Sequence, residues 1–134
     1  MLCYLFFYTG RHNFGWAADG IIAEFGITNA TLGWASAGML WAYGLGQLVN
    51  GNLADRFGAR VMMTLGAVLS VLMNWATSFA PTFTTLVVLW TINGYCQSLG
   101  FAPGSRLLSN WWSKRERGKA FGFYTFAAAS STIV

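Results

Sequence analysis

Apolar stretches of about 20 residues, separated by short polar breaks, follow one another along this chain. Only 9% of the residues are charged, whereas a typical soluble domain has about 25%. A helix of about 20 residues is long enough to cross the hydrocarbon core of a bilayer. We therefore expect an all-α membrane protein with spans at residues 2–22, 32–53, 61–79, 86–108 and 120–134. Because the last span reaches Val134 without a polar stop, we interpret the sequence as a fragment of a larger chain or a truncated gene product.

The basic residues predict how these spans are oriented. Arg56 and Arg60 lie between the second and third spans, and a basic cluster at 114–119 lies between the fourth and fifth. On the opposite side, the connection after the first span carries Asp19 and Glu24, and the connection at residues 80–84 carries no charge. Loops on the cytoplasmic side carry the excess of Lys and Arg. We expect a multi-pass plasma-membrane protein, in bacteria of the inner membrane, with a cytoplasmic N-terminus.

Several functional classes have no support in the sequence. The net charge of +4 does not indicate nucleic-acid binding, because the basic residues flank apolar spans instead of forming one solvated face. Cys3 and Cys96 lie within apolar spans, without the spacing of a disulfide framework or a metal site. There is no nucleophile–base pair, Gly-rich phosphate loop or metal-ligand cluster. We expect no enzymatic activity, no cofactor and no metal, and we expect the lipid bilayer to surround the chain.

Arg11 is a single charge inside the first apolar span. With a rise of about 1.5 Å per residue, it lies roughly 14 Å from Leu2, near the middle of the hydrocarbon core. A cation at this depth is costly unless it faces a protein interior or a water-filled cavity, and it marks a functional site. The span has no carboxylate at the same depth, so an anion is the expected partner. Tyr8 and Tyr4 lie one and two turns away on the same helix face.

A second motif lies between the second and third spans, in the segment 51–60. Asp55, at the end of a span, can cap a neighbouring helix and pair with a basic residue. Gly51 would allow another helix to pass close by, and Gly58 permits a tight turn. The segment resembles the loop motif of the major facilitator superfamily, which implies an ion-paired latch that opens and closes during alternating access. The predicted latch consists of Gly51, Asp55, Arg56, Gly58, Arg60, Glu116 and Arg117.

Three further stretches narrow this resemblance. They are Arg11-His12-Asn13-Phe14, the fourth-span run from Asn93 to Gly100 with Gln97 inside it, and Trp111-Trp112-Ser113 followed by Glu116-Arg117-Gly118. Together they are similar to the organophosphate:phosphate antiporter family, which includes glycerol-3-phosphate and hexose-phosphate transporters. The resemblance covers essentially the whole chain. It implies the N-terminal four and a half helices of a twelve-helix fold built as two six-helix bundles.

The resemblance also implies a substrate site. In that family a first-helix arginine binds phosphate, and Arg11 matches it; a guanidinium binds two phosphate oxygens at once and stays charged. The expected substrate-binding residues are Arg11, Tyr4, Tyr8, Tyr43, Gln47 and Tyr124. The chain departs from the family pattern at three positions. Gln47 replaces a lysine, Ala128 a histidine, and Tyr124 a tryptophan. With fewer cations a phosphate dianion is held less well, so a monoanionic, carboxylate or phosphonate substrate remains open.

The predicted function is therefore a secondary transporter of a phosphorylated metabolite, exchanged for inorganic phosphate and monomeric as the full-length protein. The alternatives are a proton-coupled symporter of an organic carboxylate or sugar acid, and a transporter-like sensor of sugar phosphate.

Other polar residues in the spans are expected to have structural roles. Asn93 and Gln97 share one helix face and can line the cavity or bond between helices, and we favour the bond. His12 can couple protons or hydrogen-bond a neighbouring helix, and we favour the bond. Arg106 is expected to anchor its helix end or join Glu116 and Arg117. The GxxxG pairs at 100–104 and 118–122 are expected to pack helices closely.

Overall fold

The computed structural model describes residues 2–130, with side chains from residue 7 onward. These residues form six helices and no strand. The helices are α1 (Leu2–Trp16), α2 (Ala18–Phe25), α3 (Asn29–Phe57), α4 (Ala59–Ser78), α5 (Phe83–Trp111) and α6 (Arg117–Ser130). The chain is therefore all-α, as its sequence predicts.

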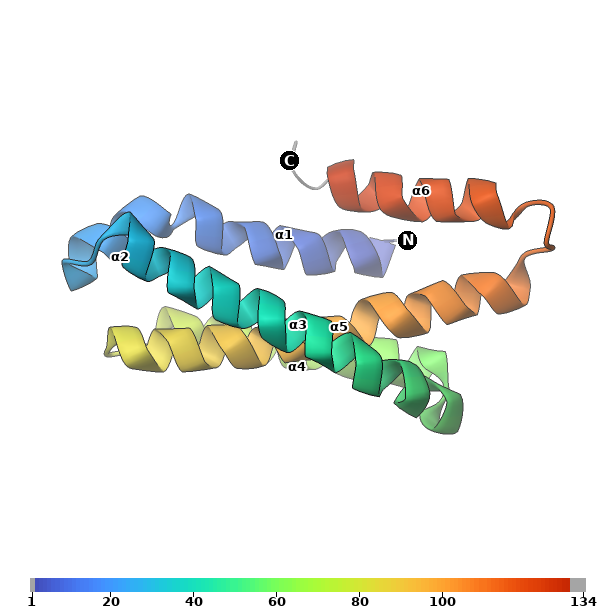
Figure 1. Cartoon of the computed structure of the whole chain (residues 1–134), viewed down its shortest axis with the longest axis horizontal. Coiled ribbons are helices and arrows are strands. Elements are labelled where there is room, and N and C mark those ends of the chain that lie inside the picture. Colours follow the sequence, from blue (N-terminus) through green and yellow to red (C-terminus); the bar gives the residue numbers. More distant parts are fainter. Residues whose placement is uncertain (1, 131–134) are drawn as a thin grey trace.

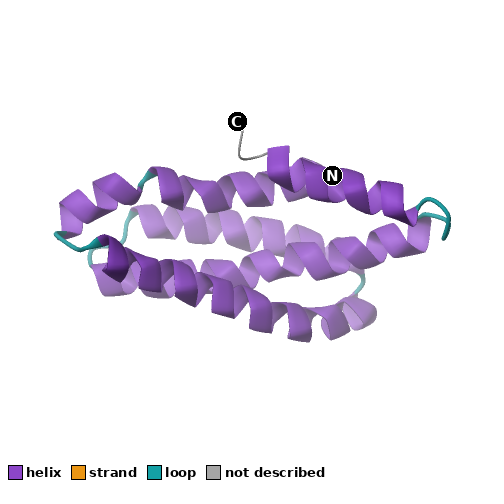
Figure 2. Cartoon of the chain, turned by 45° about the horizontal axis from the view of Figure 1, so that its top comes forward, coloured by secondary structure: helices purple, strands orange, loops and turns teal. Residues whose placement is uncertain are grey.

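The long helices lie along a common axis and each runs opposite to the next long helix in the chain, so that α3 and α5 point one way and α1, α4 and α6 the other (Figures 1 and 2). α3 and α4 each pack extensively on α5, whereas α1 lies beside α6 and contacts α4 and α5 less. The α3–α4 and α5–α6 connections lie at one end of the molecule, on the right in Figure 1. We call it the basic end, because it carries the cluster 114–119 together with Arg56 and Arg60. α2 and the α4–α5 turn lie at the opposite end, as the alternation of charged loops predicts.

Local sequence explains where the helices begin and end. The Thr28 hydroxyl accepts a hydrogen bond from the Thr31 amide at 3.4 Å, and Thr82 does the same for Thr85 at 3.3 Å. A threonine before the first turn satisfies a helical N–H that would otherwise lack an acceptor. The single-residue turn between α3 and α4 is Gly58, with φ of 84°. Residues with a Cβ rarely adopt this conformation, which confirms the tight turn predicted at Gly58.

The helices differ in extent from the predicted spans. Residues 2–22 do not form one helix, because the chain turns at Ala17. The second helix, α2, continues to Phe25 and is followed by Gly26, which has φ of 61°. α3 and α5 have 29 residues each, or about 43 Å of helix, more than the 30 Å or so of a hydrocarbon core. The last predicted span is observed as α6 up to Ser130, and 131–134 lie outside the described residues.

Two aromatic rings lie in a buried cluster between α1, α3 and α5. The rings of Phe14 and Trp90 are stacked with their centroids 4.4 Å apart. They belong to a buried cluster of Phe14, Leu32, Ala35, Met39, Leu86 and Trp90. α3 passes close to α5 at Gly94, where an added Cβ would lie 2.8 Å from Met39 Cγ and 3.0 Å from its carbonyl carbon. The absence of a side chain at Gly94 permits this close approach.

Three glycines predicted to lie at close helix contacts do not. A Cβ built at Gly51, Gly118 or Gly122 meets no atom within 4 Å among the described residues. For Gly51 the reason is geometric, since α3 makes its close approaches to α5 at Gly38 and Gly46. The other predicted pair does pack, because Gly100 faces Phe7 and Gly104 faces Tyr124.

Judged singly on length and apolar composition, α4 is the helix among residues 2–130 that could cross a membrane. α3 and α5 are longer but carry polar residues such as Asn50, Asn93 and Gln97, all buried against other helices. On the outer surface, the exposed fractions of Trp41 and Leu48 are both 73%. Side chains of this kind on an outer helix face suit lipid contact.

Candidate anion-binding site

Arg11 lies half-buried on α1, facing α3 and α5. Its Nε donates a hydrogen bond to Gln97 Oε1 at 2.9 Å. Its guanidinium carbon lies 4.3 Å from the ring centroid of Tyr43 and 5.0 Å from that of Tyr8. Aromatic rings at these distances attract a cation, and more strongly where water is excluded. The structure thus brings together three predicted site residues, Arg11, Tyr8 and Tyr43.

This contact pattern leaves most of the guanidinium available. A guanidinium has five N–H donors in a planar fork, and the bond to Gln97 uses the single donor on Nε. Among the described residues no carboxylate forms an ion pair with Arg11; the pair that the structure contains is Asp55–Arg106. A partly buried cation without a carboxylate partner favours binding of an anion, and the two Nη groups can hold two oxygens of a phosphate or carboxylate.

A chain of hydrogen bonds continues from Gln97 into the interface between α4 and α5. Gln97 Nε2 donates to Ser70 Oγ at 3.4 Å, and Ser70 Oγ donates to Asn93 Oδ1 at 2.9 Å. All three side chains are buried. Asn93 therefore makes the interhelical bond expected from the sequence. Gln97 also makes the expected interhelical bond. In addition it contacts Arg11, a contact that the sequence did not predict.

The remaining predicted site residues have other surroundings. The Tyr124 hydroxyl donates to the Gly100 carbonyl at 3.3 Å, and the side chain is buried on α6. Gln47 is half-buried and makes no side-chain hydrogen bond within residues 7–130. The side chain of Tyr4 lies outside the described residues. Arg11, Tyr8, Tyr43 and Gln97 therefore define the candidate site.

The predicted latch lies at the basic end. Asp55, at the end of α3, forms an ion pair and hydrogen bond with Arg106 of α5. Arg106 thus pairs with Asp55 and not with the α5–α6 loop. The Arg60 guanidinium carbon lies 5.5 Å from the ring centroid of Trp111, and Arg56 is exposed.

Glu116 and Arg117, the other predicted latch residues, close the α5–α6 connection. Arg117 donates from Nη2 to the Ser109 carbonyl at 2.6 Å and from Nε to the Trp112 carbonyl at 3.3 Å. Carbonyls at a helix C-terminus lack intrahelical donors, so a nearby arginine stabilises them. Ser113 Oγ donates to a carboxylate oxygen of Glu116 at 3.4 Å.

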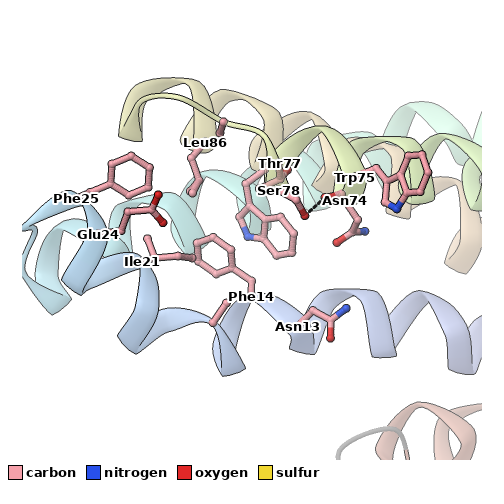
Figure 3. A pocket seen from close by; sticks show the side chains of 13 residues that line it. Asn13, Phe14, Ile21, Glu24, Phe25, Asn74, Trp75, Thr77, Ser78 and Leu86 are labelled. Carbon is pink, nitrogen blue, oxygen red and sulfur yellow. Dashed lines mark hydrogen bonds between the residues drawn. The ribbon is translucent and has the colours of Figure 1, made fainter.

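A pocket of about 320 Å³ lies near the opposite end, between α1, α2, α4 and α5 (Figure 3). Its polar lining includes the carboxylate of Glu24 and the amides of Asn13 and Asn74. No Lys or Arg lines it. The pocket therefore suits an anion less well than the surroundings of Arg11. No group of three or more His, Cys, Asp or Glu side chains lies together in the described part of the chain.

Comparisons with known proteins agree with this architecture. The family model described as Major Facilitator Superfamily matches residues 1–134. The "Probable hexose phosphate transport protein" of Chlamydia trachomatis is 35% identical over 117 residues, covering 87% of this chain and 26% of the relative. The "Phosphoglycerate transporter protein" of Salmonella typhimurium is 31% identical over 126 residues, covering 94% and 27%. The "D-galactonate transporter" of Escherichia coli is 32% identical over 123 residues, covering 88% and 27%.

The chain thus spans about a quarter of the length of the curated relatives it matches. Its described residues are all-helical, as expected for the N-terminal part of a member of that superfamily. The match extends over every residue of the chain. The chain belongs to the major facilitator superfamily.

Proposed function

We propose that the chain is the N-terminal part of a secondary active transporter for a phosphorylated metabolite of the sugar-phosphate or glycerol-3-phosphate type. Inorganic phosphate is the counter-substrate, and the two exchange by alternating access. The observation that carries the proposal is the guanidinium of Arg11, held by Gln97 and two tyrosine rings with both Nη groups left for an anion. Relatives named as hexose phosphate and phosphoglycerate transporters support this class of substrate.

The basic end supports alternating access. Asp55 and Arg106 are about half-exposed, at 45% and 52%, and an ion pair this exposed contributes about 0–1 kcal/mol. Such a pair can break and re-form as the helices move. The excess of Lys and Arg in the loops at this end supports a cytoplasmic location for those loops and therefore for the N-terminus. The membrane is then the plasma membrane, which in bacteria is the inner membrane. We propose that the complete transporter is monomeric.

A second candidate is a proton-coupled symporter of an organic carboxylate or sugar acid. Two observations favour it. Gln47 and Ala128 stand where the organophosphate family has cations, so Arg11 is the only cation that the described residues place at the site. One relative is named as a D-galactonate transporter.

Counterflow in proteoliposomes of the whole transporter separates the two candidates. Vesicles preloaded with phosphate take up glycerol-3-phosphate or a hexose phosphate if the protein is an antiporter. Uptake of a sugar acid that needs a pH gradient and no internal phosphate supports the symporter and overturns the antiport proposal.

Arg11→Lys tests the site within the same assay. Lysine keeps the charge but loses the Nε bond to Gln97 and the bidentate fork. Loss of one charge-assisted hydrogen bond costs about 1.5–3 kcal/mol, so transport should fall at least about tenfold. Arg115→Lys, on the exposed α5–α6 loop, is the matched control and should transport normally. Parental uptake by Arg11→Lys, with normal membrane insertion, removes Arg11 from the site.

A further inference from the structure

The hydrogen-bond chain behind Arg11 has a fixed direction. An arginine Nε–H can only donate, so the bond of 2.9 Å to Gln97 requires the amide oxygen of Gln97 to face α1. The Gln97 amide nitrogen then faces α4, where Ser70 Oγ accepts its hydrogen bond at 3.4 Å. The Ser70 hydroxyl in turn donates to Asn93 Oδ1 at 2.9 Å. A side chain on α4, away from the substrate site, thus fixes the amide that holds Arg11.

Holding the guanidinium by Nε matters for recognition of an anion. Rotation of the guanidinium out of its present plane would break the Gln97 bond and alter its stacking between Tyr8 and Tyr43. Because Nε is already bonded to Gln97, the two Nη groups are the pair that can bind two oxygens in parallel. The neutral amide of Gln97 does this without cancelling the charge, which a carboxylate at the same position would do.

We infer that Gln97 is a positioning residue for the anion site and that Ser70 fixes the orientation of its amide. The transport test of this inference rests on the proposed function. Its spectroscopic test depends only on the geometry of Arg11, Gln97 and Ser70. Neither residue needs to touch the substrate. Their effect is on the affinity for the anion, through the orientation of Arg11.

A second buried network on the same helix provides a matched control. Asn50 Nδ2 of α3 donates to Ser98 Oγ at 2.6 Å, and Ser98 Oγ donates to the Tyr95 carbonyl at 2.6 Å. Ser98 and Ser70 are both buried, with exposed fractions of 0% and 5%, and both join α5 to another helix. The Ser98 network includes no charged residue. Ser98→Ala therefore has the structural cost of losing an interhelical bond without affecting Arg11.

Transport kinetics of the whole protein test the inference. Ser70→Ala should raise the half-saturation concentration for phosphate about threefold to tenfold, the range of one interhelical hydrogen bond in a membrane. Its maximal rate should change less than the half-saturation concentration, because the orientation of Arg11 acts on the affinity for the anion. Ser98→Ala should leave the half-saturation concentration unchanged. Gln97→Glu should insert normally but lose phosphate uptake, because the new carboxylate pairs with Arg11. Equal half-saturation concentrations for Ser70→Ala and Ser98→Ala, or normal uptake by Gln97→Glu, overturn the inference.

A spectroscopic measurement decides the inference even if the parent transports no anion, a result that refutes the proposed function alone. In protein labelled with ¹⁵N-arginine, the Nε–H signal of Arg11 is assigned by its absence in Arg11→Lys. This signal should exchange slowly with water in the parent and in Ser98→Ala. It should shift and exchange faster in Ser70→Ala. An unchanged Arg11 signal in Ser70→Ala overturns the inference, whatever the transport results show.

Discussion

The close approach of α3 to α5 predicts that Gly94→Ala destabilises the fold. An alanine Cβ at position 94 would lie 2.8 Å from Met39 Cγ and 3.0 Å from the Met39 carbonyl carbon, with the carbonyl oxygen nearer still. Carbon atoms in ordinary contact are about 3.5–4.0 Å apart. The methionine side chain can rotate away, but the carbonyl group belongs to the backbone of α3. The two helices must therefore separate by roughly 0.5–1 Å at this point.

The cost follows from that separation. A gap of about 0.5–1 Å removes a quarter to a half of the dispersion energy of the atoms that face it, and overpacking of this kind costs about 1–3 kcal/mol. Alanine also gains about 0.8–1.0 kcal/mol of helix propensity over glycine. Gly44→Ala on α3 has the same gain without the clash, since no atom lies within 4 Å of its Cβ. Comparison of the two variants isolates the packing term, so Gly94→Ala should be less stable than Gly44→Ala by about 1–3 kcal/mol.

SDS titration of the whole transporter in mixed micelles, followed by far-UV circular dichroism, measures the free energy of unfolding. The parent and both alanine variants are compared under identical conditions. If Gly94→Ala unfolds with the same free energy as Gly44→Ala, the helices do not cross at Gly94 and the reasoning is refuted.

Substitutions at three further positions have distinct expected outcomes. Asp55→Asn should change the free energy of unfolding by less than about 1 kcal/mol, because its pair with Arg106 is exposed, yet it should slow counterflow; an unchanged rate would exclude a gating role. Tyr124→Phe should lose about 1 kcal/mol of stability with its hydrogen bond to Gly100, and equal stability in the SDS titration would contradict this. Tyr43→Phe should keep parental affinity for phosphate, while Tyr43→Leu should weaken it about twofold to fivefold, since a cation–π contact contributes about 0.5–1 kcal/mol. Equal uptake curves for the two Tyr43 variants would argue against ring stacking.

Local signals in the sequence were sufficient for the turn between α3 and α4 and for part of the site. The tight turn at Gly58 depends on neighbouring backbone atoms only, and the structure confirms it. Arg11 and Tyr8 share a helix face, so the helical period alone predicts that their side chains are neighbours. Tyr43 is on another helix, so its place among the predicted site residues depended on the family resemblance and not on the helical period. The structure shows its ring in contact with Arg11.

Tertiary contacts could not be predicted in the same way. Asn93 and Gln97 share a helix face, but the period does not say which helix that face meets or how the helix is rotated. The structure shows that this face meets both Ser70 on α4 and Arg11 on α1. The prediction of a close helix contact at Gly51 was wrong for the same reason, since a glycine permits a close approach but does not cause one. A glutamine at the depth of a buried arginine was the available signal for the role of Gln97.

The charge of Arg11 limits which anion the candidate site can bind. A phosphate ester near neutral pH carries a charge of about −1.5 to −2, whereas a sugar acid carries one negative charge. At an effective dielectric constant of 20, two unit charges 4 Å apart attract by about 4 kcal/mol, so Arg11 can balance one negative charge but not two. The tyrosine rings and the Gln97 amide are neutral and add no compensation. A dianionic ester therefore needs a second cation from outside residues 2–130, while a monoanion is satisfied by Arg11 alone. The same geometry thus fits both candidate functions, and a second cation at the site would favour the phosphate ester.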